Sequence, residues 1–86
     1  MVDLVERLQH DDIVVDIRHP DDVQKKPLAL EQTTLQIPYF NIKQLIPQLD
    51  SEQRYLLYCD HAMMSRIQAE LMAEQGIDNV HVLTLR

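Results

Sequence analysis

Short apolar runs, separated by segments with helical character, are the feature that most limits how this chain can fold. Ile13–Ile17, Tyr55–Tyr58 and Val80–Leu83 are almost wholly apolar. Thr33–Ile37 is a fourth, β-branched run that stops at Pro38. Nearly continuous apolar strands are typical of a parallel sheet that is covered on both faces. The order of the segments therefore predicts an α/β fold, with a small, mostly parallel sheet flanked by helices.

The segments before and between the first three strands predict two helices and one long loop. Val2–Gln9 has apolar residues at helical spacing, so we expect a short amphipathic helix there. Pro20–Gln32 is polar, which predicts a surface loop with one helical turn at Asp21–Gln24. Asn41 is expected to cap a short helix that ends or kinks at Pro47.

A longer helix is predicted before the last strand. Ser65 suits its N-cap or first turn, and the helical pattern runs to Gln75. Gly76, the only glycine, follows directly and is expected in the left-handed conformation that closes many helices. The apolar residues expected to face the core are Ile67, Leu71 and Met72.

Length and charge limit the classes of partner. The 86 residues fit a single domain, residues 1–86, with 45% apolar residues for one core. The formal net charge is −6 and the eight Lys and Arg are scattered, which argues against direct binding of nucleic acid by this chain. An acidic surface is compatible with docking onto a basic partner. No apolar run approaches the roughly 20 residues of a membrane span, and the start lacks the pattern of a secretory signal.

Cys59, the only cysteine, is the main candidate for a reactive group. It ends the Tyr55–Tyr58 run and precedes a helix, so backbone amides and the helix dipole favour a thiolate or a persulfide there. A single cysteine forms no internal disulfide, which suits a reducing, cytoplasmic setting. The alternative interpretation is a buried, inert thiol. No metal-ligand pattern or cofactor motif stands out, so neither a metal nor a cofactor is expected.

The residues near Cys59 have opposing expected effects on a negative charge at its sulfur. Asp60 opposes a negative charge on the sulfur, whereas His61 and Arg66 could offset it. Met63 and Met64 are either core residues or a soft apolar lip for a docking partner. In the Ile13–Ile17 run, Asp16 needs partners because an unpaired buried carboxylate is very costly. With Arg18 it either pins the following loop or takes part in catalysis directly.

These residues resemble those of rhodanese (sulfurtransferase) domains. In that superfamily an Asp-x-Arg element closes an early strand, as Asp16-Ile-Arg18 would, and the catalytic cysteine opens a six-residue loop, as Cys59 would. More narrowly, nearly the whole chain resembles the C-terminal rhodanese domain of bacterial tRNA 4-thiouridine sulfurtransferases. The segments that carry this resemblance are Asp11–Arg18, Lys26–Leu28, Pro38–Phe40, Tyr55–Asp60, Met64–Arg66 and Glu74–Val80.

The resemblance implies a sulfur carrier. Cys59 would accept sulfane sulfur from a cysteine desulfurase as a persulfide and pass it to a downstream protein or domain. The product would be 4-thiouridine in tRNA and, in some bacteria, the thiazole of thiamine. Since the family enzyme has further domains, this chain alone should not thiolate tRNA. The implied active-site loop is Asp60, His61, Ala62, Met63, Met64 and Ser65, with Asp16, Arg18 and Arg66 in support.

Some loop positions depart from the usual pattern of the family. Met64 stands where rhodaneses that use thiosulfate often carry Arg, so a protein persulfide is the expected donor. Ala62 and His61 replace the usual Gly and Arg, which makes the loop differently shaped and less basic. Three alternatives stay open: a phosphatase or arsenate reductase of the same fold, which needs an Arg where Ser65 stands, a separate thiosulfate-using rhodanese, and a non-catalytic interaction module.

Overall fold

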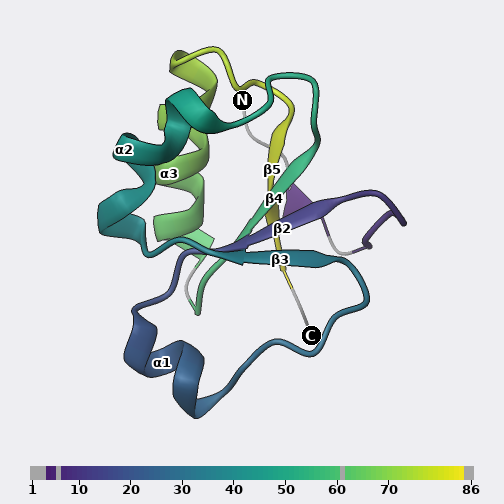
Figure 1. Ribbon diagram of the computed structural model, residues 1–86, viewed down its shortest axis with the longest axis vertical. Helices are drawn as coiled ribbons and strands as arrows, with labels where there is room; N and C mark the ends of the chain where they lie inside the picture. Colours follow the sequence, from purple (N-terminus) through teal and green to yellow (C-terminus); the bar gives the residue numbers. More distant parts are fainter. Residues whose placement is uncertain (1–3, 6, 61, 85–86) are drawn as a thin grey trace.

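A five-stranded, wholly parallel sheet forms the centre of the computed structural model, which describes residues 4–5, 7–60 and 62–84 (Figure 1). The order of the strands is β1-β5-β4-β2-β3. This confirms the predicted α/β class, and the four predicted strands are all present. The strands are β1 (Leu4–Val5), β2 (Ile13–Asp16), β3 (Thr33–Gln36), β4 (Tyr55–Tyr58) and β5 (Val80–Leu83).

The helical segments lie in the connections between strands. Two of them, η1 and η2, are short 3₁₀ helices on either side of α2. Among the described residues, no helix is long and apolar enough to cross a membrane. The helical segments are α1 (Pro20–Lys25), η1 (Tyr39–Asn41), α2 (Ile42–Leu45), η2 (Ile46–Gln48) and α3 (Ala62–Glu74).

The predicted N-terminal helix is wrong at Leu4–Val5, which form the edge strand β1. Leu4 pairs with Val82 and Val5 with Leu83, and the amide of Thr84 donates to the carbonyl of Val5 at 2.9 Å. An isolated helix of this length is marginal in water, so the open edge of β5 provides the better partners for the backbone. Residues 2, 3 and 6 of the predicted helix lie outside the described residues.

The segment from η1 to η2 differs from the single capped helix that was predicted. The side chain of Asn41 makes no capping hydrogen bond, so the prediction of a cap was wrong. The α-helix ends at Leu45, just before Pro47 as predicted, and Pro47 lies at the start of the 3₁₀ helix η2 that follows. Proline is tolerated at the first positions of a helical segment, where its missing N–H has no partner to lose.

Helix α3 begins at Ala62, earlier than predicted, so Ser65 is not its N-cap but the fourth residue of the helix, in its first turn. The buried positions are Ser65, Ala69 and Met72, at helical spacing, whereas Ile67 is 52% exposed and was wrongly assigned to the core. Gly76 follows the helix with φ of +96°, which confirms the predicted left-handed residue.

Two apolar clusters cover the two faces of the sheet. Because side chains alternate along a strand, Val15 and Leu57 pack on the face covered by α2 and α3. Val14 and Leu56 pack on the opposite face, against apolar residues such as Leu28 from the α1–β3 connection. Figure 1 shows α2 and α3 together on one side of the sheet and α1 apart from them.

The pairing of β2 with β4 sets the position of the site. Asp16 is in register with Tyr58, and the amide of Ile17 donates to the carbonyl of Tyr58 at 2.9 Å. The residues that follow both strands, including Arg18 and Cys59, therefore leave the sheet at the same edge.

Candidate active site

A pocket of about 300 Å³ opens at the carboxyl ends of β2 and β4. Ligand sites of parallel α/β sheets lie at this edge. Within the described part of the chain, no group of three or more His, Cys, Asp and Glu side chains is arranged to hold a metal ion. The pocket is lined by Ile17, Arg18, His19, Asp22, Tyr39, Cys59, Asp60 and Met64.

Cys59 follows β4 directly, and its sulfur accepts a hydrogen bond from a buried hydroxyl. The Oγ of Ser65 donates to the Sγ of Cys59 at 3.1 Å, and Ser65 is completely buried. Helix α3 begins three residues after Cys59, so the positive end of its dipole lies close to the sulfur along the chain. A hydroxyl donor and a helix N-terminus both stabilise negative charge on sulfur.

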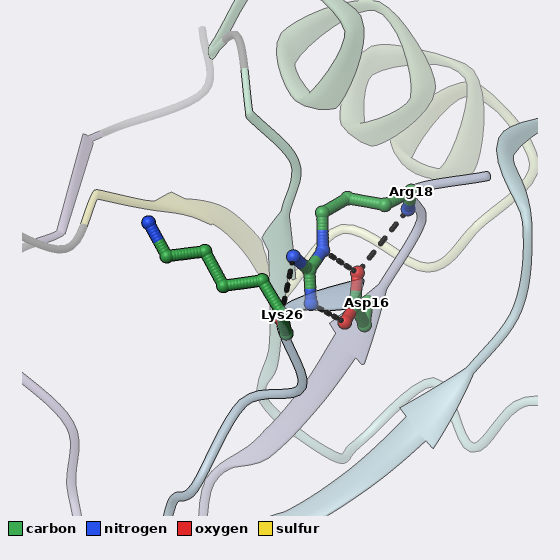
Figure 2. A network of polar contacts seen from close by, with 3 residues as sticks. All are labelled: Asp16, Arg18 and Lys26. Atoms are coloured by element: carbon green, nitrogen blue, oxygen red, sulfur yellow. Dashed lines mark hydrogen bonds and ion pairs between the residues drawn. The ribbon is translucent and has the colours of Figure 1, made fainter. Parts of the chain in front are cut away.

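Arg18 is held by a buried network behind the pocket (Figure 2). Its Nε donates to Oδ1 of Asp16 at 2.9 Å and its Nη2 to Oδ2 at 2.7 Å. Its Nη1 donates to the carbonyl of Lys26 at 2.9 Å, and its own amide donates to Oδ1 of Asp16 at 3.2 Å. The network ties the end of β2 to the C-terminus of α1, so it fixes one wall of the pocket.

The environment of Arg18 keeps it positively charged. Its hydrogen bonds to Asp16 raise the pKa of the guanidinium; burial opposes this, while the negative charges of Asp16 and Asp60 act in the same direction. Its Cζ also lies 5.2 Å from the centre of the Tyr58 ring, a favourable cation–π distance. The guanidinium is thus committed largely to structural partners.

His19 and two carboxylates complete the polar lining. His19 caps α1, and its Nδ1 accepts a hydrogen bond from the amide of Asp21 at 3.1 Å. Asp22, in the first turn of α1, and Asp60, next to Cys59, both line the pocket. The lining therefore contains two carboxylates and one guanidinium. The positive charge of this guanidinium is already balanced by Asp16.

The structure brings together part of the predicted set. Cys59, Asp60, Met64 and Arg18 line one pocket, and Ser65 and Asp16 contact two of them. The roles assigned to these residues stay predictions.

Other predicted residues lie elsewhere. Met63 and Arg66 are exposed and do not line the pocket, so Met63 is not a core residue. His61 lies outside the described residues, and Ala62 is described only as the first residue of α3.

Four lining residues were not predicted from the sequence. Ile17 and His19 flank Arg18, so the rule that sites gather at strand ends could have identified them. Tyr39 comes shortly after the end of β3, so the same rule could have identified it. Asp22 gave no signal, because its position depends on how α1 folds back over the end of β2.

The fold is shared with a protein of known structure. The structure matches a solved rhodanese-related protein from Thermoplasma volcanium with a TM-score of 0.69 and 21% identity, over 84% of this chain and 68% of that one. No protein-family model matches the chain. The chain thus has the same fold as this rhodanese-related protein.

At the level of sequence, the chain is homologous to a part of bacterial tRNA sulfurtransferases. It is 43% identical over 82 residues to the tRNA sulfurtransferase of Edwardsiella ictaluri and 42% identical over 82 residues to that of Yersinia pestis. Each alignment covers 94% of this chain but 17% of the relative. The resemblance seen in the sequence is confirmed, and the chain spans about a sixth of the length of these relatives.

Proposed function

We propose that this chain carries sulfane sulfur as a persulfide on Cys59. The observation that carries the proposal is the buried Ser65 hydroxyl, which donates to the Cys59 sulfur at 3.1 Å at the edge of an open pocket. A hydrogen-bond donor so placed stabilises both a thiolate and the anionic form of a persulfide. The relation to tRNA sulfurtransferases supports sulfur transfer as the chemistry.

The proposed donor is a protein persulfide, as formed by a cysteine desulfurase. The Cys59 thiolate attacks the outer sulfur of the donor R–S–SH, a new S–S bond forms, and the old one breaks. The donor leaves as R–S⁻, Cys59 becomes Cys59–S–SH, and no other oxidant or reductant is consumed. A reducing, cytoplasmic setting keeps both thiols available for this exchange.

The proposed destination of the sulfur is 4-thiouridine in tRNA, with the thiazole of thiamine as a second outlet. The matched relatives are named tRNA sulfurtransferases, and this chain covers only a small part of them. The sulfur on Cys59 would therefore pass to a downstream protein or domain that holds and activates the RNA.

The lining of the pocket supports a protein donor over thiosulfate. Asp22 and Asp60 would repel a dianion, and Arg18 is already bound to Asp16. A persulfide at the end of a cysteine side chain brings a single charge at most and needs no second cation.

Intact-mass spectrometry tests the proposal. The chain is incubated with a cysteine desulfurase and cysteine, and a gain of about 32 Da, one sulfur atom, is expected. Cys59→Ser is the control and should gain nothing. The proposal fails if the wild-type chain shows no adduct under conditions that load a known persulfide acceptor.

A further inference from the structure

Exposed apolar side chains border the Cys59 pocket. Tyr39 lines the pocket, and its ring meets the ring of Phe40 edge-on with centroids 5.3 Å apart. The Phe40 centroid also lies 6.1 Å from that of His19, another lining residue. We call Tyr39 and Phe40 the mouth patch.

The mouth patch holds two exposed aromatic side chains that contact each other. Among the described residues, five large apolar side chains are more than a third exposed, and Tyr39 and Phe40 are two of them. The other three are Leu4 on β1 and Met63 and Ile67 on α3. Single exposed apolar residues need no explanation, but a group at the rim of a pocket indicates an interaction surface.

Negative charge lies among these apolar residues. The carboxylates of Asp22 and Asp60 line the same pocket, and the one lining guanidinium, Arg18, is paired with Asp16 at 2.7 Å. Asp21 is exposed next to His19. The formal net charge of −6 for the whole chain has the same sign. Charge complementarity therefore calls for a partner with cationic side chains.

We infer that the mouth patch docks a protein whose sulfur-bearing cysteine is flanked by apolar and cationic side chains. This inference rests on the proposed function, since it describes the protein that exchanges sulfur with Cys59. The apolar neighbours of that cysteine would cover Phe40 and Tyr39, and the cationic ones would face Asp22 and Asp60. A second copy of this chain is a poorer occupant, because it would bring its own carboxylates against these.

Peptide disulfides test the inference. Three peptides of equal length carry one cysteine as a 2-thiopyridyl disulfide, flanked by Leu and Lys, by Leu and Glu, or by Ser and Lys. The Cys59 thiolate attacks the peptide sulfur, forms a mixed disulfide and releases pyridine-2-thione, which is followed by absorbance. Each rate is divided by the rate of the same peptide with N-acetylcysteine, which removes differences in intrinsic reactivity.

The Leu/Lys peptide should react about tenfold faster than either other peptide at low salt, and its advantage over Leu/Glu should shrink as salt rises. Phe40→Ser should remove most of the preference for Leu/Lys over Ser/Lys. Leu4→Ser is the matched control, because Leu4 is 51% exposed and Phe40 53%, and should change nothing. Equal corrected rates for the three peptides, or equal effects of the two variants, would overturn the inference.

The two assays together, with one further measurement, separate the possible failures. The peptide assay needs no persulfide, so a chain that prefers the Leu/Lys peptide but gains no sulfur from a desulfurase contradicts only the proposed function. A chain that gains sulfur but shows no peptide preference contradicts only the docking surface. Sedimentation of the wild-type chain completes the test, because a dimer that Phe40→Ser dissociates would assign the patch to a second copy and overturn the inference.

Discussion

The Ser65 hydroxyl and the Arg18 guanidinium are both buried near Cys59, but they differ in what they contact. Ser65 donates to the reacting sulfur itself. Arg18 donates instead to Asp16 and to the carbonyl of Lys26. Substitutions at Ser65 should therefore change reactivity with little effect on folding, whereas substitutions at Arg18 should first change stability.

Ser65→Ala should slow alkylation of Cys59 by iodoacetamide about tenfold, because a hydrogen bond to a charged group contributes about 1.5 kcal/mol or more. The second-order rate constant at neutral pH measures this effect. Ser51→Ala removes an exposed hydroxyl in the turn before β4 and is the control. A rate for Ser65→Ala equal to that of the wild type would show that the hydrogen bond does not support the thiolate.

Arg18→Met should lower the free energy of unfolding by about 3 kcal/mol or more, because it leaves the Asp16 carboxylate buried and unpaired. Urea unfolding measures the loss. Adding Asp16→Asn to this variant removes the orphaned charge and should restore part of the stability. Arg66→Met, which removes an exposed arginine, should change the free energy by less than about 0.5 kcal/mol. Equal losses for Arg18→Met and Arg66→Met would contradict a structural role for the Asp16–Arg18 pair.

Among the strands and helices, those that depend on local pattern could be predicted from the sequence. The strands β2 to β5 could be identified because each is a nearly continuous apolar or β-branched run. The two-residue strand β1 could not, since it exists only because β5 offers an open edge. The start of α3 was misplaced because Ser65 is the best capping residue by type, whereas contact with the Cys59 sulfur places it inside the helix.

In the candidate site, too, the sequence predicted the features that depend on local pattern and missed those that depend on the fold. Arg18 and Cys59 were placed correctly because each follows a predicted strand, and strand ends of a parallel sheet share an edge. Asp22 depends on how α1 turns back over that edge, which no local pattern specifies. A partner for Asp16 was expected because a buried carboxylate needs one, but its identity as Arg18, and the contact of Arg18 with Lys26, required the structure.

The left-handed conformation of Gly76, after the end of α3, leads to a prediction about stability. Gly76→Ala should cost roughly 1 kcal/mol, because a residue with a side chain adopts positive φ only at an energetic cost. No other atom lies within 4 Å of the added Cβ, so the cost is that of the backbone alone. Chemical denaturation measures it, with Gln75→Ala as the control at the preceding exposed position. An unchanged midpoint for Gly76→Ala would contradict the assigned conformation.

At the scale of the whole molecule, the distribution of charge separates possible sulfur donors. The chain has a formal net charge of −6, and carboxylates line the pocket itself. A small dianion meets repulsion from both, whereas a protein with a basic surface is attracted before it makes contact. We expect the same charge distribution to disfavour contact with phosphate backbones.

Met64→Arg should raise kcat/KM for thiosulfate about tenfold or more, because it places a cation in the lining of the pocket. Cyanide-dependent formation of thiocyanate measures the rate. Met63→Arg makes the same change of charge at an exposed residue outside the lining and should have a much smaller effect. If both variants gain equally, the net charge of the molecule, and not the lining, governs the use of thiosulfate.

The pairing of β1 with β5 has a practical consequence for handling the protein. Because these strands are parallel, with Leu4 opposite Val82 and Val5 opposite Leu83, β1 begins at the edge of the sheet opposite the one where β5 ends. The ends of β5, β4 and β2 lie at the same edge of the sheet, because these strands are parallel (Figure 1). An affinity tag or fluorescent fusion attached after β5 would therefore emerge beside the pocket and crowd it. The same addition placed before β1 would leave from the far edge, so immobilisation through the N-terminus should leave Cys59 accessible.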